Sequence, residues 1–378
     1  MRTLDDLLAP ITPEVFHRDF DDRKPLHVPA ADDAPRRCLL NWDDFNALLD
    51  QSAIWNAATL KMVHDNRPIP PEQYCVLVQT QSGTVTRPSP GKVQALMAMG
   101  ASVILGDVES LTPGLRALSS DLSRRFAAQV GVNLYCSFGG VQAFGSHYDL
   151  HHVFAVQLEG EKTWRLYSNR EADPIDLPDD SDGRARERLH AARGQLVQEV
   201  RMKPGDVLYL PRGQFHDALA TEGASLHATF SVTPLYGRIL FRLLESAALQ
   251  DPAFRRWLRP AAEGGGAPLK AQLADLGARL AALTASPAFA DEIAMAQTRL
   301  TPRAPAYGLP VRTQLTFLAP TGRAAPRVAG PAAVAMDWIL TQSRVALEDV
   351  IAQFDFVPEE DLRAAVDRLL AAGALRRV

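Results

Sequence analysis

The sequence predicts an α+β chain in which a jelly roll of short strands is followed by a helical C-terminal part. From residue 131 to residue 233 apolar residues recur with period two, and glycine or Pro-Gly turn signals interrupt them. Many short strands with such punctuation are typical of a sandwich or barrel. Beyond Pro234 an apolar spacing of three and four residues replaces this pattern and predicts helices. We expect three domains, 1–235, 236–300 and 301–378.

Composition excludes several classes of protein. The 378 residues allow two or three domains, and 47% hydrophobic and 22% charged residues are ordinary for a globular protein. No apolar run approaches the roughly 18 residues of a membrane helix, and the N-terminus shows no secretory signal. Three scattered cysteines fit a reducing compartment, so the cytoplasm is the expected location. The net charge of −4 gives no sign of a nucleic-acid-binding protein.

The first 130 residues predict mainly helices. Prolines and possible caps such as Thr12 and Asn41 mark where helices begin and where the backbone is extended. The expected elements are a helix near Thr12, an extended piece at 24–29, a helix at 41–52, a loop at 67–71, helices around 92–100 and 113–130, and a β-like stretch at 102–106.

Six strands are expected in the period-two region. They cover residues 133–138, 153–158, 163–167, 196–202, 206–210 and 225–232. Gly160 and the Pro204-Gly205 pair are expected to turn the chain between strands. The polar residues 168–195 interrupt this run and predict a solvated loop with one helical turn at most.

The C-terminal part predicts two helical regions. The first has helices at 236–250, 252–258, 269–284 and 287–300, with a glycine joint at 264–266. A leucine stripe from Leu269 to Leu283 fits either an intrachain bundle or a helix pair for self-association.

The second region begins with a strand at 311–318, continues with helices at 332–341, 347–354 and 358–372, and ends in a short strand at 373–376. This order is the outline of a winged helix. Acidic residues such as Glu359 and Asp361 crowd the side that would face nucleic acid, and they repel phosphate. We therefore expect no direct nucleic-acid binding and a structural or protein-contact role.

Three residues predict a metal centre. His147 and Asp149 are two positions apart, so on a strand they would face the same side. His216 follows a strand and a Pro/Gly turn, and strands distant in sequence lie side by side in a jelly roll. Two histidines and one carboxylate are the facial ligand set typical of non-haem Fe(II) oxygenases. A lone histidine is more often a surface or core residue, but this combination in an all-β region favours the metal.

Such a centre leaves coordination positions for a chelating 2-oxo acid and for O₂. The far carboxylate of the 2-oxo acid requires a cation, and Lys162, just after Gly160, is the best candidate. The alternative is an exposed turn lysine, which periodicity alone favours.

Three stretches together, 147–149, 157–167 and 205–216, resemble the JmjC-type ribosomal protein hydroxylases. That family includes a bacterial arginine hydroxylase of a ribosomal protein and nucleolar histidine hydroxylases. The resemblance covers nearly the whole chain. It implies a JmjC/cupin-like double-stranded β-helix, a helical dimerisation domain and a C-terminal winged helix.

The resemblance also implies a site. Fe(II) would be held by His147, Asp149 and His216, and 2-oxoglutarate by Lys162. Residues expected in the pocket are Asn133, Tyr135 and Thr229 near the co-substrate, and Ser225 and His227 toward the substrate. Ser225, His227 and Thr229 share one face of a regular strand, and ordinary jelly-roll packing is the alternative for these three.

One departure concerns the residues after Asp149. The family often has acidic residues there, whereas this chain has Leu150, His151 and His152. On a regular strand His151 would lie roughly 13 Å from His147, too far for a fourth ligand. It is instead a candidate for substrate contact or for the rim of the site.

The resemblance implies oxidative decarboxylation of 2-oxoglutarate to succinate and CO₂, coupled to hydroxylation of a protein side chain. A ribosomal protein is the leading substrate, and the chain is expected to be a homodimer. Two alternatives stay open. One is hydroxylation of a peptide natural product or small molecule, and the other is a non-catalytic, cupin-like metal-binding protein that interacts with partners.

Overall fold

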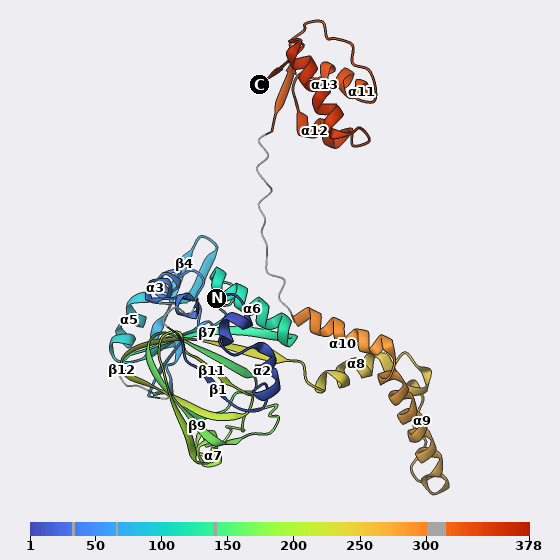
Figure 1. Cartoon of the computed structure of the whole chain (residues 1–378). Helices are drawn as coiled ribbons and strands as arrows, with labels where there is room; N and C mark the ends of the chain where they lie inside the picture. Colours follow the sequence, from blue (N-terminus) through green and yellow to red (C-terminus); the bar gives the residue numbers. More distant parts are fainter. Residues whose placement is uncertain (32–34, 66, 139–141, 301–314) are drawn as a thin grey trace. The chain divides into compact units, whose positions relative to one another are not determined.

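The computed structural model describes residues 1–31, 35–65, 67–138, 142–300 and 315–378. The chain falls into two compact units, Met1–Ala304 and Pro305–Val378 (Figure 1). The first unit contains both the β region and the helices of residues 236–300, so the expected division at residue 235 stays a prediction.

Helix caps predicted from the sequence are present. The Thr12 side chain accepts a hydrogen bond from the Val15 N–H at the start of α2 (Pro13–Asp19). Asn41 and Asp44 cap each other's backbone N–H at the start of α3 (Trp42–Asp50). Such caps satisfy N–H groups that have no partner within the helix. A further helix, α1 (Leu4–Leu8), precedes them and buries its leucines.

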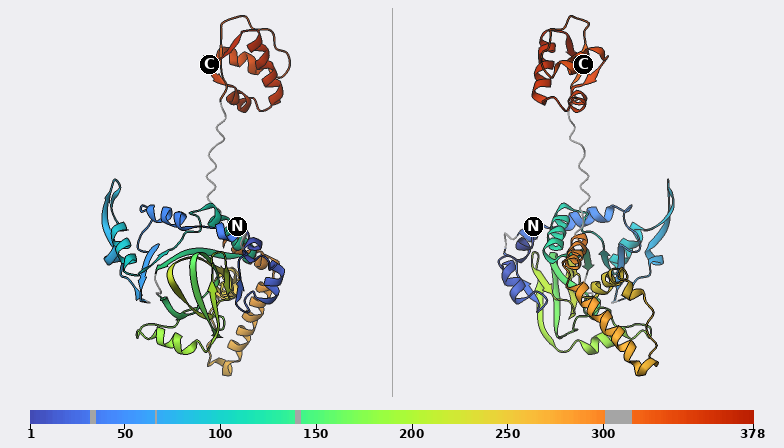
Figure 2. Two further views of the ribbon diagram at one scale, coloured as in Figure 1. Left: turned by 60° about the vertical axis from the view of Figure 1, so that its left-hand side comes forward. Right: turned by 90° about the vertical axis from the view of Figure 1, so that its right-hand side faces the viewer.

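A large antiparallel sheet dominates the first unit. Within the described residues it has ten strands in the order β1-β11-β9-β12-β7-β6-β2-β3, with β10 on β9 and β8 on β12. The strands curve around an interior (Figures 1 and 2), which confirms the predicted jelly roll of an α+β chain. The bounds are β1 (Leu26–Val28), β2 (Leu60–His64), β3 (Arg67–Pro68), β6 (Ser102–Leu105), β7 (Ala128–Phe138), β8 (Gln142–His147), β9 (His152–Arg170), β10 (Leu196–Met202), β11 (Val207–Leu210) and β12 (Gln214–Pro234).

The predicted turn at Gly160 is wrong. Strand β9 runs through this position without a break, with Gly160 at φ +62°. An added Cβ atom here would lie 1.9 Å from the Ala224 carbonyl oxygen of β12, so the close approach of the two backbones requires glycine. The two expected strands, 153–158 and 163–167, are therefore one strand.

Strand β9 changes the face that its side chains present as it passes Gly160. Val153 and Ala155 pack in one buried cluster with Trp164 and Leu166, although the first pair is odd-numbered and the second even-numbered. The pairing with β12 slips where Leu226 faces Glu159 but His227 faces Gln157. A slip of one residue exchanges the faces of a strand. Even-numbered residues after the slip thus point to the interior.

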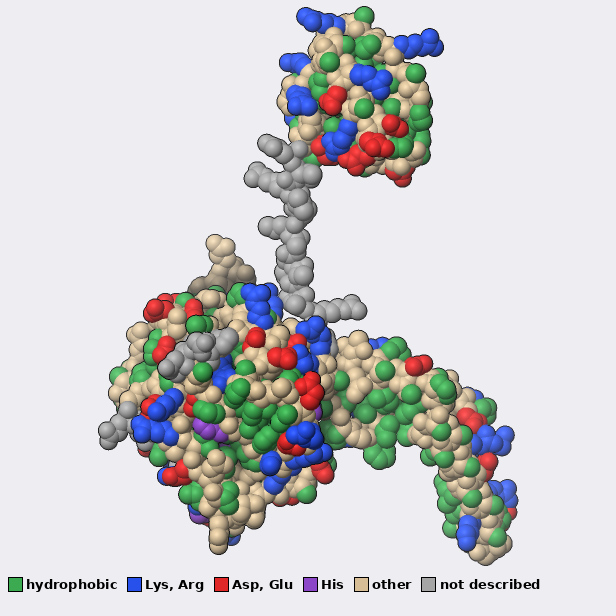
Figure 3. Space-filling view, viewed as in Figure 1, with side chains coloured by type: hydrophobic (Ala, Val, Ile, Leu, Met, Phe, Trp, Pro, Cys, Tyr) green, Lys and Arg blue, Asp and Glu red, His purple; other side chains and the backbone are tan. Residues whose placement is uncertain are grey.

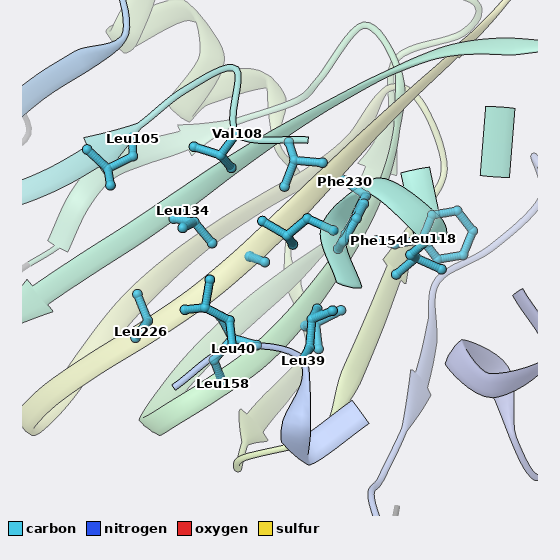
Figure 4. Close-up of a cluster of buried hydrophobic side chains, with 14 of the residues drawn as sticks. Leu39, Leu40, Leu105, Val108, Leu118, Leu134, Phe154, Leu158, Leu226 and Phe230 are labelled. Carbon is cyan, nitrogen blue, oxygen red and sulfur yellow. The ribbon is translucent and has the colours of Figure 1, made fainter. Parts of the chain in front are cut away.

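The main hydrophobic core lies between this sheet and the N-terminal helices. Helix α6 (Pro113–Phe126) contributes Leu118, which lies near Phe154 and Phe230 of the sheet (Figure 4). Each such fully buried side chain stabilises the fold by about 1.5–3 kcal/mol relative to exposure. The core fixes β9 and β12, the two longest strands, from their outer side.

The region around residues 67–100 is more structured than expected. Residues 67–71, predicted as a loop, contribute β3 and the start of α4 (Pro71–Tyr74). A separate two-stranded sheet follows, β4 (Cys75–Thr80) and β5 (Gly83–Pro88), and then α5 (Pro90–Ala98). The hairpin stands out from the rest of its unit in Figure 2. A short 3₁₀ turn, η1 (Pro35–Cys38), lies earlier in the chain.

The helices after the jelly roll are α8 (Arg238–Ala248), α9 (Ala267–Thr284) and α10 (Pro287–Leu300). The predicted helix at 252–258 is only a 3₁₀ turn, η2 (Pro252–Arg255), and a second such turn, η3 (Glu263–Gly266), contains the glycine joint. No residue of α9 is buried, so its leucine stripe is not covered by an intrachain bundle. None of the described helices is long and apolar enough to cross a membrane.

The second unit has its own core. Its elements are β13 (Phe317–Pro320), α11 (Ala333–Thr341), β14 (Val345–Ala346), α12 (Leu347–Gln353), α13 (Glu359–Ala371) and β15 (Leu375–Arg377), with the strands in the order β14-β13-β15. Met336, Ile339, Leu362 and Leu369 fill the interior. The expected strand at 311–318 lies partly outside the described residues. The assignment as a winged helix stays a prediction.

Candidate functional site

The two histidines predicted as metal ligands are neighbours across two strands. His147 ends β8, His216 lies near the start of β12, and they face each other in the pairing of these strands. Their ring centroids are 4.5 Å apart. Asp149 does not share the strand face of His147 as expected, because β8 ends at His147. It lies in the following loop, where its carbonyl oxygen accepts a 2.9 Å hydrogen bond from the Gly213 N–H.

The ring nitrogens of both histidines are oriented by backbone carbonyl groups. Nδ1 of His147 is 2.9 Å from the Gly145 oxygen, and Nδ1 of His216 is 2.9 Å from the Gln214 oxygen. When Nδ1 donates to a carbonyl, Nε2 is the nitrogen whose lone pair can bind a metal. Nε2 of His216 is 3.6 Å from Asp149 Oδ2. Ligand atoms of the three residues lie within 4.8 Å of one another, so they could bind one metal ion.

The electrostatics favour the protonation states that a metal requires. Burial, followed by the nearby His147, lowers the pKa of His216 to about 4. Burial alone would raise the pKa of Asp149, but His147, His216 and His151 together lower it below its usual value. Near neutral pH the site therefore presents a neutral His216 imidazole and a carboxylate, the forms that bind metal ions.

These residues open into one cavity of about 320 Å³. It contains nine of the ten predicted site residues, since only Ser225 is not among those lining it. The lining residues are Asn133, Tyr135, His147, Asp149, His151, Val153, Lys162, Trp164, His216, Ala218, His227, Thr229 and Ser231.

Lys162 is a buried cation, not an exposed turn lysine. Its side chain is 3% exposed, and burial lowers its pKa to about 8. No hydrogen bond or ion pair of its ammonium group is found within the described residues. A buried charge without a partner is costly. The geometry therefore suits an anionic group of a ligand in the cavity.

Aromatic side chains surround Lys162. Tyr135 and His227 stack with centroids 4.8 Å apart, and Trp164 lies 5.7 Å from His227. Burial raises the pKa of Tyr135 to about 12 and keeps the pKa of His227 well below its usual value. Nδ1 of His227 and Nε1 of Trp164 are buried and have no partner among the described atoms. The side chains that line the cavity next to Lys162 thus include two polar atoms without a partner among the described residues.

Ser225 corrects one expectation. It shares the strand face of His227 and Thr229, because β12 pairs with β7 in regular register from Ala224 to Pro234, but it does not line the cavity. Its hydroxyl is buried and accepts a 2.9 Å hydrogen bond from Nε2 of Gln157. The same amide nitrogen lies 2.9 Å from the Glu159 carbonyl oxygen. Ser225 therefore takes part in the hydrogen bonds that stabilise the irregular part of β9.

The two unexplained histidines have different environments. His151 lines the cavity, and its charge contributes to the low pKa of Asp149. His152 is buried outside the cavity, where Nδ1 lies 3.2 Å from the Tyr209 hydroxyl and 3.3 Å from the Arg212 N–H. His152 thus ties β9 to the end of β11.

Trp164 is one of four cavity residues that the sequence did not indicate; the others are Val153, Ala218 and Ser231. Its ring lies 5.6 Å from that of His216. The signal was available in principle, since Trp164 is two positions after Lys162 and so shares its strand face. From the sequence alone, a tryptophan in an apolar strand predicts a residue of the hydrophobic core, and only the structure shows that it lines a cavity.

Comparison with known proteins places this site in a family context. Residues 115–238 match the family described as JmjC domain. This range contains all ten predicted site residues. This part of the chain is therefore similar to a JmjC domain, in agreement with the cupin-like mixture of sheet and helices described above.

Several curated relatives are similar over part of their length. Ribosomal oxygenase 1 of Gallus gallus is 32% identical over 244 residues, which is 64% of this chain and 38% of that protein. The bifunctional lysine-specific demethylase and histidyl-hydroxylase NO66 of Drosophila persimilis is 31% identical over 231 residues, 61% of this chain and 31% of that protein. The chain thus spans about a third of the length of these relatives.

Among solved structures, the ribosomal oxygenase YcfD of Escherichia coli is similar across 97% of this chain and 98% of its own. The sequence identity is 15% and the TM-score is 0.48.

Proposed function

We propose that this chain is an Fe(II)- and 2-oxoglutarate-dependent oxygenase that hydroxylates a protein side chain, with a ribosomal protein as the leading substrate. The observation that carries the proposal is one cavity that holds both the His147, Asp149 and His216 group and the buried Lys162, whose ammonium group has no polar partner among the described residues. A metal site alone fits many functions. A metal site with an isolated cation on the wall of the same cavity fits a metal-chelating dianion such as 2-oxoglutarate.

In this proposal each residue has a defined role. His147, Asp149 and His216 bind the metal on one side and leave its other side open to the cavity. Lys162 binds the far carboxylate of 2-oxoglutarate, and Asn133, Tyr135 and Thr229 complete that subsite. Bound iron and co-substrate supply the oxidation, which uses O₂ to convert 2-oxoglutarate to succinate and CO₂ and adds one oxygen atom to the substrate. The aromatic walls exclude water from the reacting atoms.

The substrate side is assigned to His151 and His227, which line the cavity. A protein substrate is supported by the relatives, whose names refer to a ribosomal oxygenase and a histidyl-hydroxylase.

We also infer the arrangement of the whole chain. Residues 1–235 form the catalytic domain, 236–300 a dimerisation domain, and 301–378 a winged helix that contacts protein and not nucleic acid. A homodimer in the cytoplasm follows from this division and from the sparse cysteines.

The direct test is turnover with defined components. The metal-free chain is loaded with Fe(II) under nitrogen and mixed with 2-oxoglutarate, O₂ and purified ribosomal proteins. We expect succinate to form and one ribosomal protein to gain one oxygen atom, as measured by mass spectrometry. His147→Ala and His216→Ala should reduce both products to background, because two ligands cannot hold the metal in place.

The outcomes separate the alternatives. Succinate without a modified ribosomal protein would favour a peptide natural product or small molecule as substrate. If the chain binds neither Fe(II) nor 2-oxoglutarate in calorimetry, the oxygenase proposal fails and a non-catalytic role takes its place.

A further inference from the structure

A second polar cluster lies directly behind the metal site. Ser146 precedes His147 on β8, and Asp217 follows His216 on β12, so both side chains point to the face opposite the cavity. The two meet there, since the Ser146 hydroxyl donates a 2.7 Å hydrogen bond to Asp217 Oδ2. The residues adjacent to the two histidines are thus joined to each other.

Two further side chains converge on this pair. The Tyr167 hydroxyl of β9 donates a 2.6 Å hydrogen bond to Asp217 Oδ2. Nη1 of Arg193 lies 2.5 Å from the Ser146 hydroxyl, 3.0 Å from the Tyr167 hydroxyl and 3.7 Å from Asp217 Oδ2. The guanidinium group also lies over the Tyr167 ring, 4.4 Å from its centroid. Three strands and one loop therefore share a carboxylate that is only 2% exposed.

Helix α7 and the turn that follows it place Arg193 beside Ser146 and Asp217. Residues 185–192 form α7 (Ala185–Ala192), a two-turn helix in the segment that was expected to be a loop. After α7 the chain turns at Gly194, with φ +77°, and the Gln195 carbonyl accepts a 2.8 Å hydrogen bond from the Ser168 N–H of β9. A Cβ atom at Gly194 would lie 2.3 Å from the Ser168 hydroxyl, so the turn requires glycine.

Helix α7 also covers the cluster. Leu189 packs against a small buried group that contains Tyr167 and Phe215. On its other side α7 borders a hollow whose walls include His147, Leu189 and His190. Helix α7 thus packs against Tyr167 of the cluster and also borders the hollow that contains His147.

We propose that Asp217, Tyr167, Ser146 and Arg193 act as a positioning cluster that holds His147 and His216 at the separation required by one metal ion. The inference rests on the proposed function, because it assumes that these histidines bind metal. Asp217 accepts hydrogen bonds from both neighbouring strands, so β8 and β12 cannot shift relative to each other without breaking them. Without the cluster, Nδ1 of each histidine would keep its hydrogen bond to a backbone carbonyl, but these hydrogen bonds would not hold the two strands at a fixed distance from each other.

Groups that hydrogen-bond directly to a metal ligand typically contribute 10- to 100-fold to metal affinity. This cluster acts one residue further along each strand, so a smaller effect is expected. The test uses Co(II) as a redox-stable probe, with its dissociation constant measured from visible absorption on the metal-free full chain. We expect Tyr167→Phe and Arg193→Met each to weaken Co(II) binding by about 10-fold at most, the lower end of that range, and by clearly more than the control. Arg193→Lys, which keeps the charge, should recover part of the loss.

Arg188→Met is the matched control, since Arg188 lies on α7 but pairs with Asp182 at the surface. It should bind Co(II) like the unsubstituted chain. The unfolding temperature of each metal-free variant separates positioning from stability. Unchanged Co(II) affinity in Tyr167→Phe and Arg193→Met would overturn the proposal, whether or not those variants unfold earlier. Failure of the unsubstituted chain to bind Co(II) would overturn this proposal and the metal site together.

Discussion

At the scale of single residues, Lys162 carries the most information about function. In the unfolded chain its pKa has the ordinary value of 10.5, and burial lowers it to about 8 in the folded chain. Protonation of the folded chain is therefore less favourable than protonation of the unfolded chain. The difference corresponds to roughly 3 kcal/mol at 1.36 kcal/mol per pKa unit. In the proposed function, a bound carboxylate would offset this cost.

The first prediction follows from the sign of this shift. Below about pH 8 the full cost of the buried ammonium is present. It shrinks as pH rises from 8 to 10.5, and it vanishes above that range. Lys162→Met should therefore raise the free energy of unfolding of the metal-free chain at pH 7 by up to about 3 kcal/mol. The gain should disappear near pH 10.5, as measured by urea denaturation.

Lys61→Met is the control, because Lys61 is exposed on β2 and its loss should change stability little at either pH. A stabilisation by Lys162→Met that is equally large at both pH values would mean that hydrophobic packing, and not charge burial, is responsible.

The second prediction concerns the co-substrate. If Lys162 must be protonated to bind a carboxylate, the affinity for 2-oxoglutarate should fall about 10-fold per pH unit above pH 8. Calorimetry with Co(II) bound can measure this. In Lys162→Met binding should be weak at every pH. An affinity in the unsubstituted chain that stays constant up to pH 10 would remove Lys162 from the co-substrate subsite.

Residue types and spacing predicted the candidate metal ligands, because His147, Asp149 and His216 combine ligand chemistry with strand context. The same reasoning could not place Ser225. Ser225 shares the expected strand face, but Gln157 of the irregular part of β9 donates a hydrogen bond to its hydroxyl. The slip in β9 has no signal in a single sequence beyond Gly160 itself. The sequence suggested that glycine as a turn, which is the commoner reason for glycine between two apolar runs.

At the scale of elements, the irregular part of β9 determines which residues face the cavity. Val153 is odd-numbered and Lys162 even-numbered, yet both line it. On a regular strand one of the two would point to the outer side. Gln157 holds the irregular part through hydrogen bonds to Ser225 and to backbone carbonyl groups. Sequence patterns predicted the jelly-roll class, but they did not predict that the Lys162 side chain points into the cavity.

The third prediction tests this element. Gly160→Ala would place a Cβ atom 1.9 Å from the Ala224 carbonyl oxygen and require a left-handed backbone. The left-handed conformation alone costs about 1–2 kcal/mol for a non-glycine residue, and the contact with the β12 backbone adds to it. We expect lower stability in urea denaturation and weaker 2-oxoglutarate binding, because relief of the clash shifts Lys162.

Gly131→Ala is the matched control. Gly131 lies on β7 of the same sheet, and nothing is within 4 Å of a Cβ atom added there. Its stability should stay within about 0.5 kcal/mol of the unsubstituted chain, as for most surface substitutions. If Gly160→Ala behaves like this control, the close approach of β9 and β12 is not needed for the site.

At the scale of the whole molecule, the exposed apolar surface of α8–α10 is the feature that the single chain does not explain. Trp257 is 95% exposed and Phe241 76% exposed, and no residue of α9 is buried. Hydrophobic side chains gather along this region in Figure 3. Single exposed apolar residues need no explanation, but a gathered set indicates a surface that binds a partner.

The last prediction addresses this surface. Aromatic residues at the centre of an interface contribute most of its binding energy. If residues 236–300 form a homodimer, Phe241→Ser combined with Trp257→Ser should shift the chain from twice its own mass to a single copy in light scattering. Leu77→Ser is the control, because Leu77, at 75%, is about as exposed as Phe241 but lies on the separate β4–β5 hairpin.

The metal site is built from β8, β12 and the loop after β8 within one chain, so the monomeric variant should still bind Co(II) with unchanged affinity. A monomeric unsubstituted chain would refute the dimer. A loss of Co(II) binding in the variant would show that α8–α10 support the metal site although they supply none of its ligands.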